Sequence, residues 1–243
     1  MTHQIDQIYS QSLDKVSDFQ FDSKVVGVFP DMIKRSVPGY SQIIHGIGQI
    51  ATKTVQENSH VYDLGCSLAA ASLAIGRHVT NIPFKIKAID FSQDMVNRAK
   101  EQISAYNLNP SIDIIYQDIR ETEIENASLV ILNFTMQFLK PEDRQTLVNK
   151  IYQGLNPGGA LIVSEKLSFN SATVGKLIDD LHLDFKRANG YSELEISQKR
   201  SALENVMKPD TLETHLNRLK EAGFEHKSVW LQTLNFASMV AIK

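Results

Sequence analysis

The chain has 243 residues, a formal net charge of −3 and hydrophobic side chains at 42% of its positions. A chain of this size buries a sizeable core, and we expect residues 1–243 to form one α/β domain. The charge gives no overall basic field that would attract nucleic acid, and no apolar run approaches the length of a membrane span. We therefore expect a small-molecule substrate, no direct nucleic-acid binding and no membrane.

The chain contains one cysteine, Cys66. A single thiol forms neither an internal disulfide nor a cysteine-rich metal site, which favours a cytoplasmic protein without a bound metal. His45, His182 and His215 lack metal-ligand spacing among themselves, and we expect them to be ordinary surface or core residues.

The first 55 residues are interpreted as an N-terminal cap followed by a helix. In residues 1–38, polar stretches surround a short apolar run, and Pro30 and Pro38 interrupt the chain. This segment is either an arm that packs on the domain or a cap over a ligand cleft. From residue 40 to residue 55 the apolar side chains recur on one helical face, which predicts a helix that begins at Tyr40.

Predicted strands and helices then alternate. The strands span 60–64, 84–89, 112–117, 127–133 and 160–165, and the helices span about 69–78, 93–106 and 141–154. We expect residues 156–159, Asn-Pro-Gly-Gly, to close the last of these helices. The alternation predicts a parallel sheet with helices on both faces, and such sheets bind ligands beyond the carboxyl ends of their strands.

Residues 166–208 break this alternation and are polar and rich in charge, which we interpret as a helical insertion that covers the cleft. A helix over about 210–222 follows. The strands predicted over 228–231 and 237–242 are close enough in sequence to pair as an antiparallel hairpin. A seven-stranded, mostly parallel sheet that ends in such a hairpin is typical of the Rossmann-like fold of methyltransferases that use S-adenosyl-L-methionine (SAM).

The turn after the first strand reads Asp63-Leu64-Gly65-Cys66-Ser67, and the second strand ends in Asp90. Backbone N–H groups of such a turn approach a ligand closely, and a strand-end carboxylate accepts hydrogen bonds from ribose hydroxyls. Ser67 and Ala69 replace the glycines that a pyrophosphate needs, and Asp63 would repel phosphate but attract an amino group. The pattern favours an adenosyl ligand that is phosphate-free and partly cationic, as SAM is.

Four polar residues end successive predicted strands, namely Asp63, Asp90, Asp118 and Asn133. Because the carboxyl ends of parallel strands meet at one edge, we expect these side chains to converge on one crevice. The alternative for the turn is an ordinary strand-to-helix connection in which Asp90 is only a helix N-cap.

Three runs carry a more specific resemblance: 125–128, Glu-Asn-Ala-Ser; 151–159, Ile-Tyr-Gln-Gly-Leu-Asn-Pro-Gly-Gly; and 185–200, which begins Phe-Lys-Arg and ends Gln-Lys-Arg. Together they resemble the bacterial carboxy-S-adenosyl-L-methionine synthases, the CmoA family, over almost the full length. The resemblance implies that SAM and prephenate are converted to carboxy-S-adenosyl-L-methionine (carboxy-SAM) and phenylpyruvate. It also implies a homodimer, and a partner enzyme that uses carboxy-SAM to carboxymethylate the wobble uridine of tRNA.

The resemblance further implies a set of ligand-binding residues. These are Tyr40, Gly65, Cys66, Ser67, Asp90, Phe91, Asp118, Ile119, Asn133 and Arg200. Ala69 stands where relatives carry a further glycine, and Phe91 stands where a polar residue is expected, so Phe91 would pack on the adenine edge instead.

We assign catalytic roles to Arg200 and Tyr40. A guanidinium grips a carboxylate bidentately, so Arg200 suits a carboxylate held beside the sulfonium, with Tyr40 and Asn133 orienting the same group. No general base is assigned, because the substrate supplies one. The pairs 199–200 (Lys-Arg) and 186–187 (Lys-Arg) either meet the two carboxylates of prephenate or form a solvated helix face.

Two other functions fit the same fold. One is an ordinary SAM-dependent small-molecule methyltransferase, which would differ only in the pocket for the second substrate. The other is a non-catalytic protein that binds an adenosyl ligand and assists a tRNA-modifying enzyme.

Overall fold

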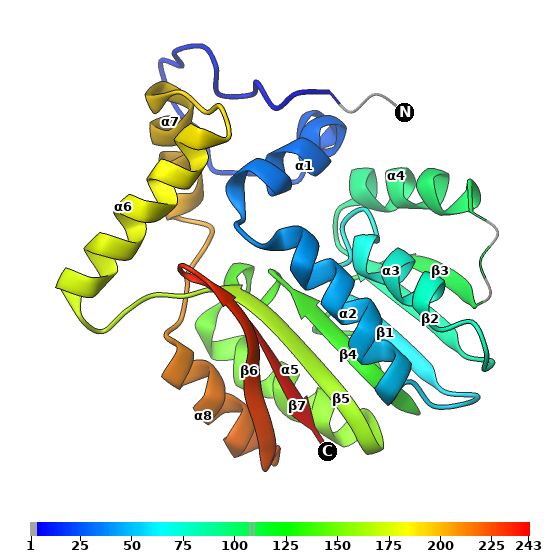
Figure 1. Cartoon of the computed structure of the whole chain (residues 1–243). Helices are drawn as coiled ribbons and strands as arrows, with labels where there is room; N and C mark the ends of the chain where they lie inside the picture. Colours follow the sequence, from blue (N-terminus) through cyan, green and yellow to red (C-terminus); the bar gives the residue numbers. More distant parts are fainter. Residues whose placement is uncertain (1–3, 107, 109) are drawn as a thin grey trace.

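The computed structural model describes residues 4–106, 108 and 110–243. Within them a seven-stranded sheet has the order β3-β2-β1-β4-β5-β7-β6 (Figure 1). The strands are β1 (His60–Leu64), β2 (Lys85–Asp90), β3 (Ser111–Tyr116), β4 (Ala127–Asn133), β5 (Leu155–Lys166), β6 (His226–Thr233) and β7 (Phe236–Ile242).

Strands β1 to β5 are parallel, and β7 runs antiparallel between β5 and β6. Two residues, Leu234 and Asn235, connect β6 to β7, so the predicted hairpin is confirmed and its strands are longer than expected. The parallel sheet and the hairpin confirm the predicted Rossmann-like methyltransferase fold.

Helices cover both faces of this sheet. They are α1 (Ser23–Ser36), α2 (Tyr40–Thr54), α3 (Ala70–His78), α4 (Gln93–Ser104), α5 (Pro141–Gly154), α6 (Ala172–Ala188), α7 (Glu193–Glu204) and α8 (Leu212–Ala222), with a short 3₁₀ helix at Met136–Phe138. In β4, Ile131 lies in one apolar cluster with Ile47 of α2, whereas Leu132 lies in another with Val148 of α5. Successive strand residues thus face opposite helix layers, which explains why the central strands are almost continuously hydrophobic.

The predicted bounds of helix α5, about 141–154, are confirmed, but the prediction that residues 156–159 close this helix is wrong. The helix stops at Gly154, where any side chain would collide with the carbonyl of Ile124, and residues 156–159 lie in β5 instead. The pairing of β4 with β5 is irregular between Ala127 and Leu129. Residues 156–159 therefore form a distorted start of β5.

The N-terminal segment packs on the domain, and Phe19, Phe21 and Phe29 from it border the cavity described below. Helix α1 starts at Asp22, whose side chain accepts hydrogen bonds from two backbone amides of the first turn, and it continues through Pro30. Pro30 therefore does not interrupt the chain as expected. Residues 1–3 of the predicted cap lie outside the described part.

Residues 166–208, called the lobe below, contain the expected helices α6 and α7. Figure 1 shows them beyond the end of β5, on the side where the parallel strands terminate. No helix in the described residues has the length and apolar character needed to cross a bilayer.

Candidate functional site

The turn after β1 is fixed by its backbone. Gly65 has a φ of 78°, and a side chain there would collide with Thr135. The amides of Gly65 and Cys66 both donate to the carbonyl of Ile89 in β2, at 2.8 and 2.9 Å. These bonds tie β1 to β2 at their carboxyl ends, where the turn backbone borders a cavity.

Two residues of the turn adopt the left-handed conformation without being glycine. Ser67 has a φ of 49° and Ala69 a φ of 59°, a conformation that costs a non-glycine residue about 1–2 kcal/mol. The Ala69 side chain lies in a buried cluster with Val96 and Ala99 of α4. The chain therefore keeps the shape of a glycine turn here and gains packing against α4.

Asp90 holds this turn together. One of its carboxylate oxygens accepts from the amide of Ser67 at 2.8 Å, and the other accepts from the amide of Ser92 at 2.9 Å. Burial raises the pKa of this carboxyl group. The N-cap of α4 is Ser92, whose hydroxyl accepts from Met95, so the alternative that Asp90 is only a helix cap is wrong.

A second buried acid lies at the base of the turn. The Asp63 carboxylate accepts from both the amide and the hydroxyl of Ser72, at 3.1 and 2.6 Å, while burial raises its pKa to about 6. Burial, with a smaller contribution from Asp63, also raises the pKa of Tyr40. In the described part of the chain the Tyr40 hydroxyl makes no hydrogen bond, and it is free to contact a ligand.

Asn133 ends β4 with an unsatisfied atom. Its Oδ1 is buried and has no hydrogen-bond partner among the described residues. Buried polar atoms nearly always have a partner, so an orphaned acceptor that borders a cavity marks a place for a ligand donor. An amino group, which donates hydrogen bonds and is cationic, fits an unpaired oxygen near Asp63.

The end of β3 contributes an acid that is already paired with an arginine. Arg120 binds the Asp118 carboxylate at 2.6 Å, and this hydrogen bond lowers the pKa of Asp118. The adjacent Ile119 is buried, while the ring of Phe91 is 61% exposed and meets Phe21 edge-on at 6.3 Å. These residues give the cavity an apolar corner next to Asp90.

The lobe brings cations to the same cavity. Lys166, Lys186, Lys199 and Arg200 all border it. Lys199 is buried and paired, with its Nζ 3.5 Å from Asp6 and 3.0 Å from the hydroxyl of Ser36. Arg200 is exposed at the cavity surface and has no ion-pair partner among the described residues.

All ten sequence-predicted site residues border one cavity of about 1130 Å³. The topology explains this convergence, because the residues follow β1, β2, β3 and β4 or lie on α2 and α7. Whether they bind SAM stays a prediction. Burial keeps the Cys66 pKa well above its usual value, so its thiol is a neutral small group rather than a nucleophile.

Several cavity residues were not in the predicted set. Phe19, Phe21 and Phe29 border the cavity from the N-terminal segment, and Lys166 and Lys186 border it from the lobe. The sequence could have indicated Lys166, because it directly follows a predicted strand, as Asp90 does.

The other member of the 186–187 pair, Arg187, lies outside the cavity and binds Glu193 and Asp184. His182 is buried, and desolvation lowers its pKa to about 3. No group of three or more His, Cys, Asp or Glu side chains in the described part of the chain is placed to hold a metal ion.

Comparison with known proteins identifies the family. Residues 61–159 match the model of a methyltransferase domain. The chain is 62% identical to a carboxy-S-adenosyl-L-methionine synthase of Shewanella loihica and 61% identical to one of Shewanella woodyi, over 98% of each chain. The chain belongs to the carboxy-S-adenosyl-L-methionine synthase family.

Solved structures support the fold. A putative SAM-dependent methyltransferase of Methanococcus maripaludis aligns with a TM-score of 0.61 at 23% identity, covering 96% of this chain and 97% of its own. Human N-acetylserotonin methyltransferase, solved in complex with SAM, aligns with a TM-score of 0.59 at 16% identity, covering 91% of this chain and 55% of its own. Both likenesses concern the fold alone.

Proposed function

We propose that this protein converts SAM and prephenate to carboxy-SAM and phenylpyruvate. The observation that carries the proposal is a single cavity with two unlike walls: buried acids and an unpaired amide oxygen at the sheet edge, and cations from the lobe. Plain methyl transfer to a neutral acceptor needs no cationic wall. Its presence favours an anionic second substrate.

The sheet edge suits the adenosyl ligand. Each Asp90 oxygen already accepts one backbone amide and retains a lone pair for a ribose hydroxyl. Asn133 Oδ1 and the Asp63 carboxylate suit the cationic amino group of the methionine part. The exposed Phe91 ring offers an apolar face to the adenine, which compensates for the missing polar residue.

The lobe suits the carboxylates. In the proposed reaction the ring carboxylate of prephenate leaves as carbon dioxide, and aromatisation expels the ring hydroxyl as hydroxide. The hydroxide takes a proton from the SAM methyl group, which the sulfonium acidifies, and the resulting carbanion attacks carbon dioxide. Phenylpyruvate and water are released with carboxy-SAM, so atoms and charges balance without an enzymic base.

The protein then has two roles: it holds the two substrates in place, and it encloses the carbon dioxide. Arg200 binds the carboxylate beside the sulfonium, and Tyr40 orients it with its free hydroxyl. The N-terminal segment and the lobe cover the cavity, which keeps carbon dioxide next to its acceptor; well-oriented partners reach effective molarities of about 10⁵ M or more.

Mass spectrometry of the small molecule released from the purified, denatured protein tests this function. We expect an adenosyl compound heavier than SAM by one carbon dioxide. Plain SAM or its demethylated product, together with no turnover of prephenate, would leave the ordinary methyltransferase. Tight SAM binding without any turnover would indicate the non-catalytic partner.

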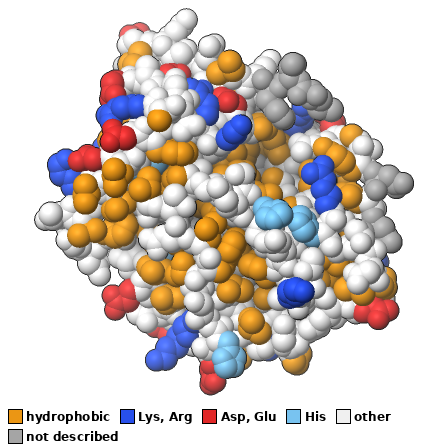
Figure 2. Space-filling view, in the orientation of Figure 1, with side chains coloured by type: hydrophobic (Ala, Val, Ile, Leu, Met, Phe, Trp, Pro, Cys, Tyr) orange, Lys and Arg blue, Asp and Glu red, His pale blue; other side chains and the backbone are white. Residues whose placement is uncertain are grey.

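We further propose a cytoplasmic homodimer that supplies a tRNA carboxymethyltransferase. Helix α6 exposes Val174, Leu177 and Leu181 at 47%, 59% and 42%, and Figure 2 shows hydrophobic side chains gathered over this helix. These residues recur at helical spacing, so they form one apolar face suited to a second copy. Light scattering of the wild type and of Leu177→Asp tests this surface, with a dimer expected for the former and a monomer for the latter.

A further inference from the structure

Besides Arg200, two lysines that border the cavity have no partner among the residues that the structure describes. Lys166 ends β5 and Lys186 lies on α6, and both are half-buried where they border the cavity. Neither ammonium group makes a hydrogen bond or an ion pair with any residue that the structure describes. Partial burial of a charged group is costly unless a partner compensates for the lost water, so the absence of a partner needs a cause.

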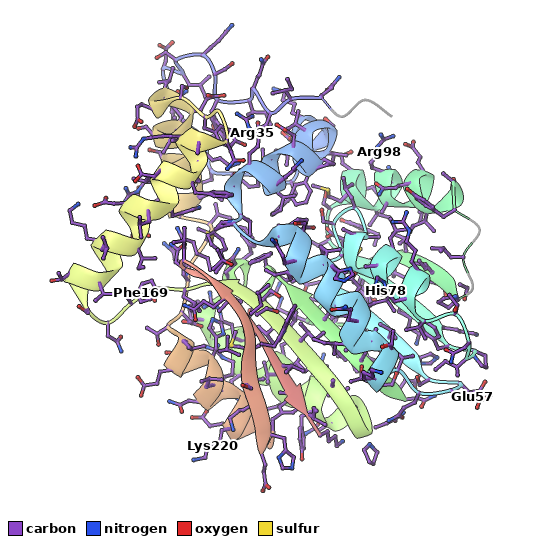
Figure 3. The ribbon with its side chains drawn as sticks, in the orientation of Figure 1. Arg35, Glu57, His78, Arg98, Phe169 and Lys220 are labelled. Atoms are coloured by element: carbon purple, nitrogen blue, oxygen red, sulfur yellow. The ribbon has the colours of Figure 1, made fainter. Side chains whose placement is uncertain are left out.

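Other cations of the same region are satisfied. Arg35 of α1 is labelled in Figure 3, near the lobe. Its Nε donates to the Asn189 carbonyl at 2.7 Å, and its Nη1 pairs with Asp31. Lys176 precedes Lys186 on the same helix, α6, and its Nζ lies 2.6 Å from the Asp180 carboxylate. The lobe therefore has carboxylates available, and Lys166 and Lys186 are the lysines it leaves unpaired inside the cavity.

The two lysines also repel their neighbours. Desolvation first, and then the charges of Lys199, Lys166 and Arg200, lower the pKa of Lys186 to about 7. Desolvation also lowers the pKa of Lys166, and a smaller contribution from Asp179 opposes this shift. Asp179 accepts a hydrogen bond from Asn235 at 3.0 Å. A bound anion would relieve this repulsion, so this cluster of cations favours an anionic ligand.

The sheet order gives the position of this cluster relative to the adenosyl ligand. The strand ends follow one another as Asp90 on β2, Gly65 on β1, Asn133 on β4 and Lys166 on β5. Asn133 pairs with Ser164, two residues before Lys166. Lys166 therefore lies on the far side of Asn133 from Asp90, beyond the expected amino-acid end of SAM.

We propose that Lys166 and Lys186 form a carboxylate subsite for the part of the second substrate that is retained in the product. This inference rests on the proposed function. Prephenate carries two carboxylates, and phenylpyruvate keeps the one on its side chain. Arg200 then serves the reacting carboxylate, and the two lysines anchor the other from binding to product release.

The test compares Lys166→Met and Lys186→Met with the wild type. Methionine keeps the apolar stem and removes the charge, and loss of a charge-assisted contact is expected to raise the KM for prephenate about 10- to 100-fold. The inhibition constant of phenylpyruvate should rise by a similar factor, because it carries the same carboxylate. The Kd of SAM, measured by calorimetry, should stay within about twofold, which also reports that the variants fold.

Two further variants complete the design. Lys176→Met removes a paired, exposed lysine from the same helix and should change none of these constants. Lys186→Arg keeps the charge and should recover most of the prephenate affinity.

Three results would overturn the inference. An unchanged KM and inhibition constant in both lysine variants would leave the subsite without function while the proposed reaction stands. A parallel loss of SAM affinity would assign the lysines to the carboxylate of SAM itself. If the wild type forms no carboxy-SAM from prephenate, the proposed function fails, and the inference fails with it.

Discussion

The two walls of the cavity differ in whether their charged side chains already have hydrogen-bond partners. At the sheet edge, the acids Asp63 and Asp90 are buried and already accept hydrogen bonds from the turn and from α3. On the lobe, the ammonium groups of Lys166 and Lys186 have no hydrogen bond in the described part of the chain. The acids of the first wall have hydrogen-bond partners before any ligand binds, whereas the lysines of the second wall gain a partner only from the proposed ligand.

The two walls also lie in different parts of the fold. The sheet edge is formed by strands and turns of the methyltransferase fold, which the solved structures share. The unpaired cations come from β5 and from an inserted helix. We infer that affinity for the adenosyl ligand resides in the first wall and choice of the second substrate in the other.

The largest effect is expected for Asp90→Ala. It leaves the amides of Ser67 and Ser92 without acceptors and removes the ribose acceptor, at about 1–3 kcal/mol for each unsatisfied group. SAM and carboxy-SAM should both bind about 100-fold more weakly, as measured by calorimetry. The free energy of unfolding in urea should fall by about 2–4 kcal/mol. Unchanged affinity would mean that Asp90 only shapes the turn.

Arg200→Ala should discriminate between the ligands. Removing a charge-assisted contact of about 1.5–3 kcal/mol should weaken carboxy-SAM about 10- to 100-fold and change SAM by less than about threefold. Calorimetry with both ligands measures this ratio, and Arg187→Ala, outside the cavity, is the matched control. Equal losses for the two ligands would contradict a role specific to the carboxylate.

Asp63 gives the sheet edge a pH dependence. Its folded pKa of about 6 lies above the ordinary value of 3.8, so the folded state binds the proton more tightly than the unfolded state. The contribution of Asp63 to stability is therefore fully present below about pH 4 and is lost as the pH rises through about 6, by about 3 kcal/mol in all. Asp63→Asn, which retains an acceptor for Ser72, should remove this part of the pH dependence.

Urea unfolding at pH 4.5 and pH 7 measures the effect of Asp63. The variant should be more stable than the wild type at pH 7 without ligand. A variant with the same difference between the two pH values as the wild type would show that another group is responsible.

The smallest effect is expected for Phe91→Ala. Loss of an exposed ring that packs on adenine should weaken SAM and carboxy-SAM alike by about 3- to 10-fold, or about 1 kcal/mol. Tyr116→Ala, which removes another exposed ring at the end of β3, is the control. Unchanged affinity would mean that Phe91 serves only its contact with Phe21.

The sequence was sufficient to predict the sheet and the edge of the site. Strand-end residues such as Asp90 and Asn133 converge because the carboxyl ends of parallel strands meet at one edge of the sheet. The end of α5 at Gly154 was predicted, but the place of residues 156–159 in β5 was not, because it depends on the pairing of Leu155 with Ala127, which is distant in sequence. The continuation of α1 through Pro30 likewise runs against local propensity.

The lobe was harder to interpret. Adjacent residues such as Lys186 and Arg187 point in different directions on a helix, so a dibasic pair gives no indication of which member enters the cavity. That Lys186 does so and Arg187 does not depends on how α6 packs, and on the acids Asp184 and Glu193 that hold Arg187 outside.

The most direct test of the central claim uses prephenate labelled with ¹³C in its ring carboxylate. The protein is incubated with SAM and this substrate, and the adenosyl product is analysed by mass spectrometry. We predict a product heavier than SAM by one labelled carbon dioxide, formed together with phenylpyruvate. A demethylated adenosyl product, or a carboxylated product without the label, would contradict carboxyl transfer from prephenate within one cavity.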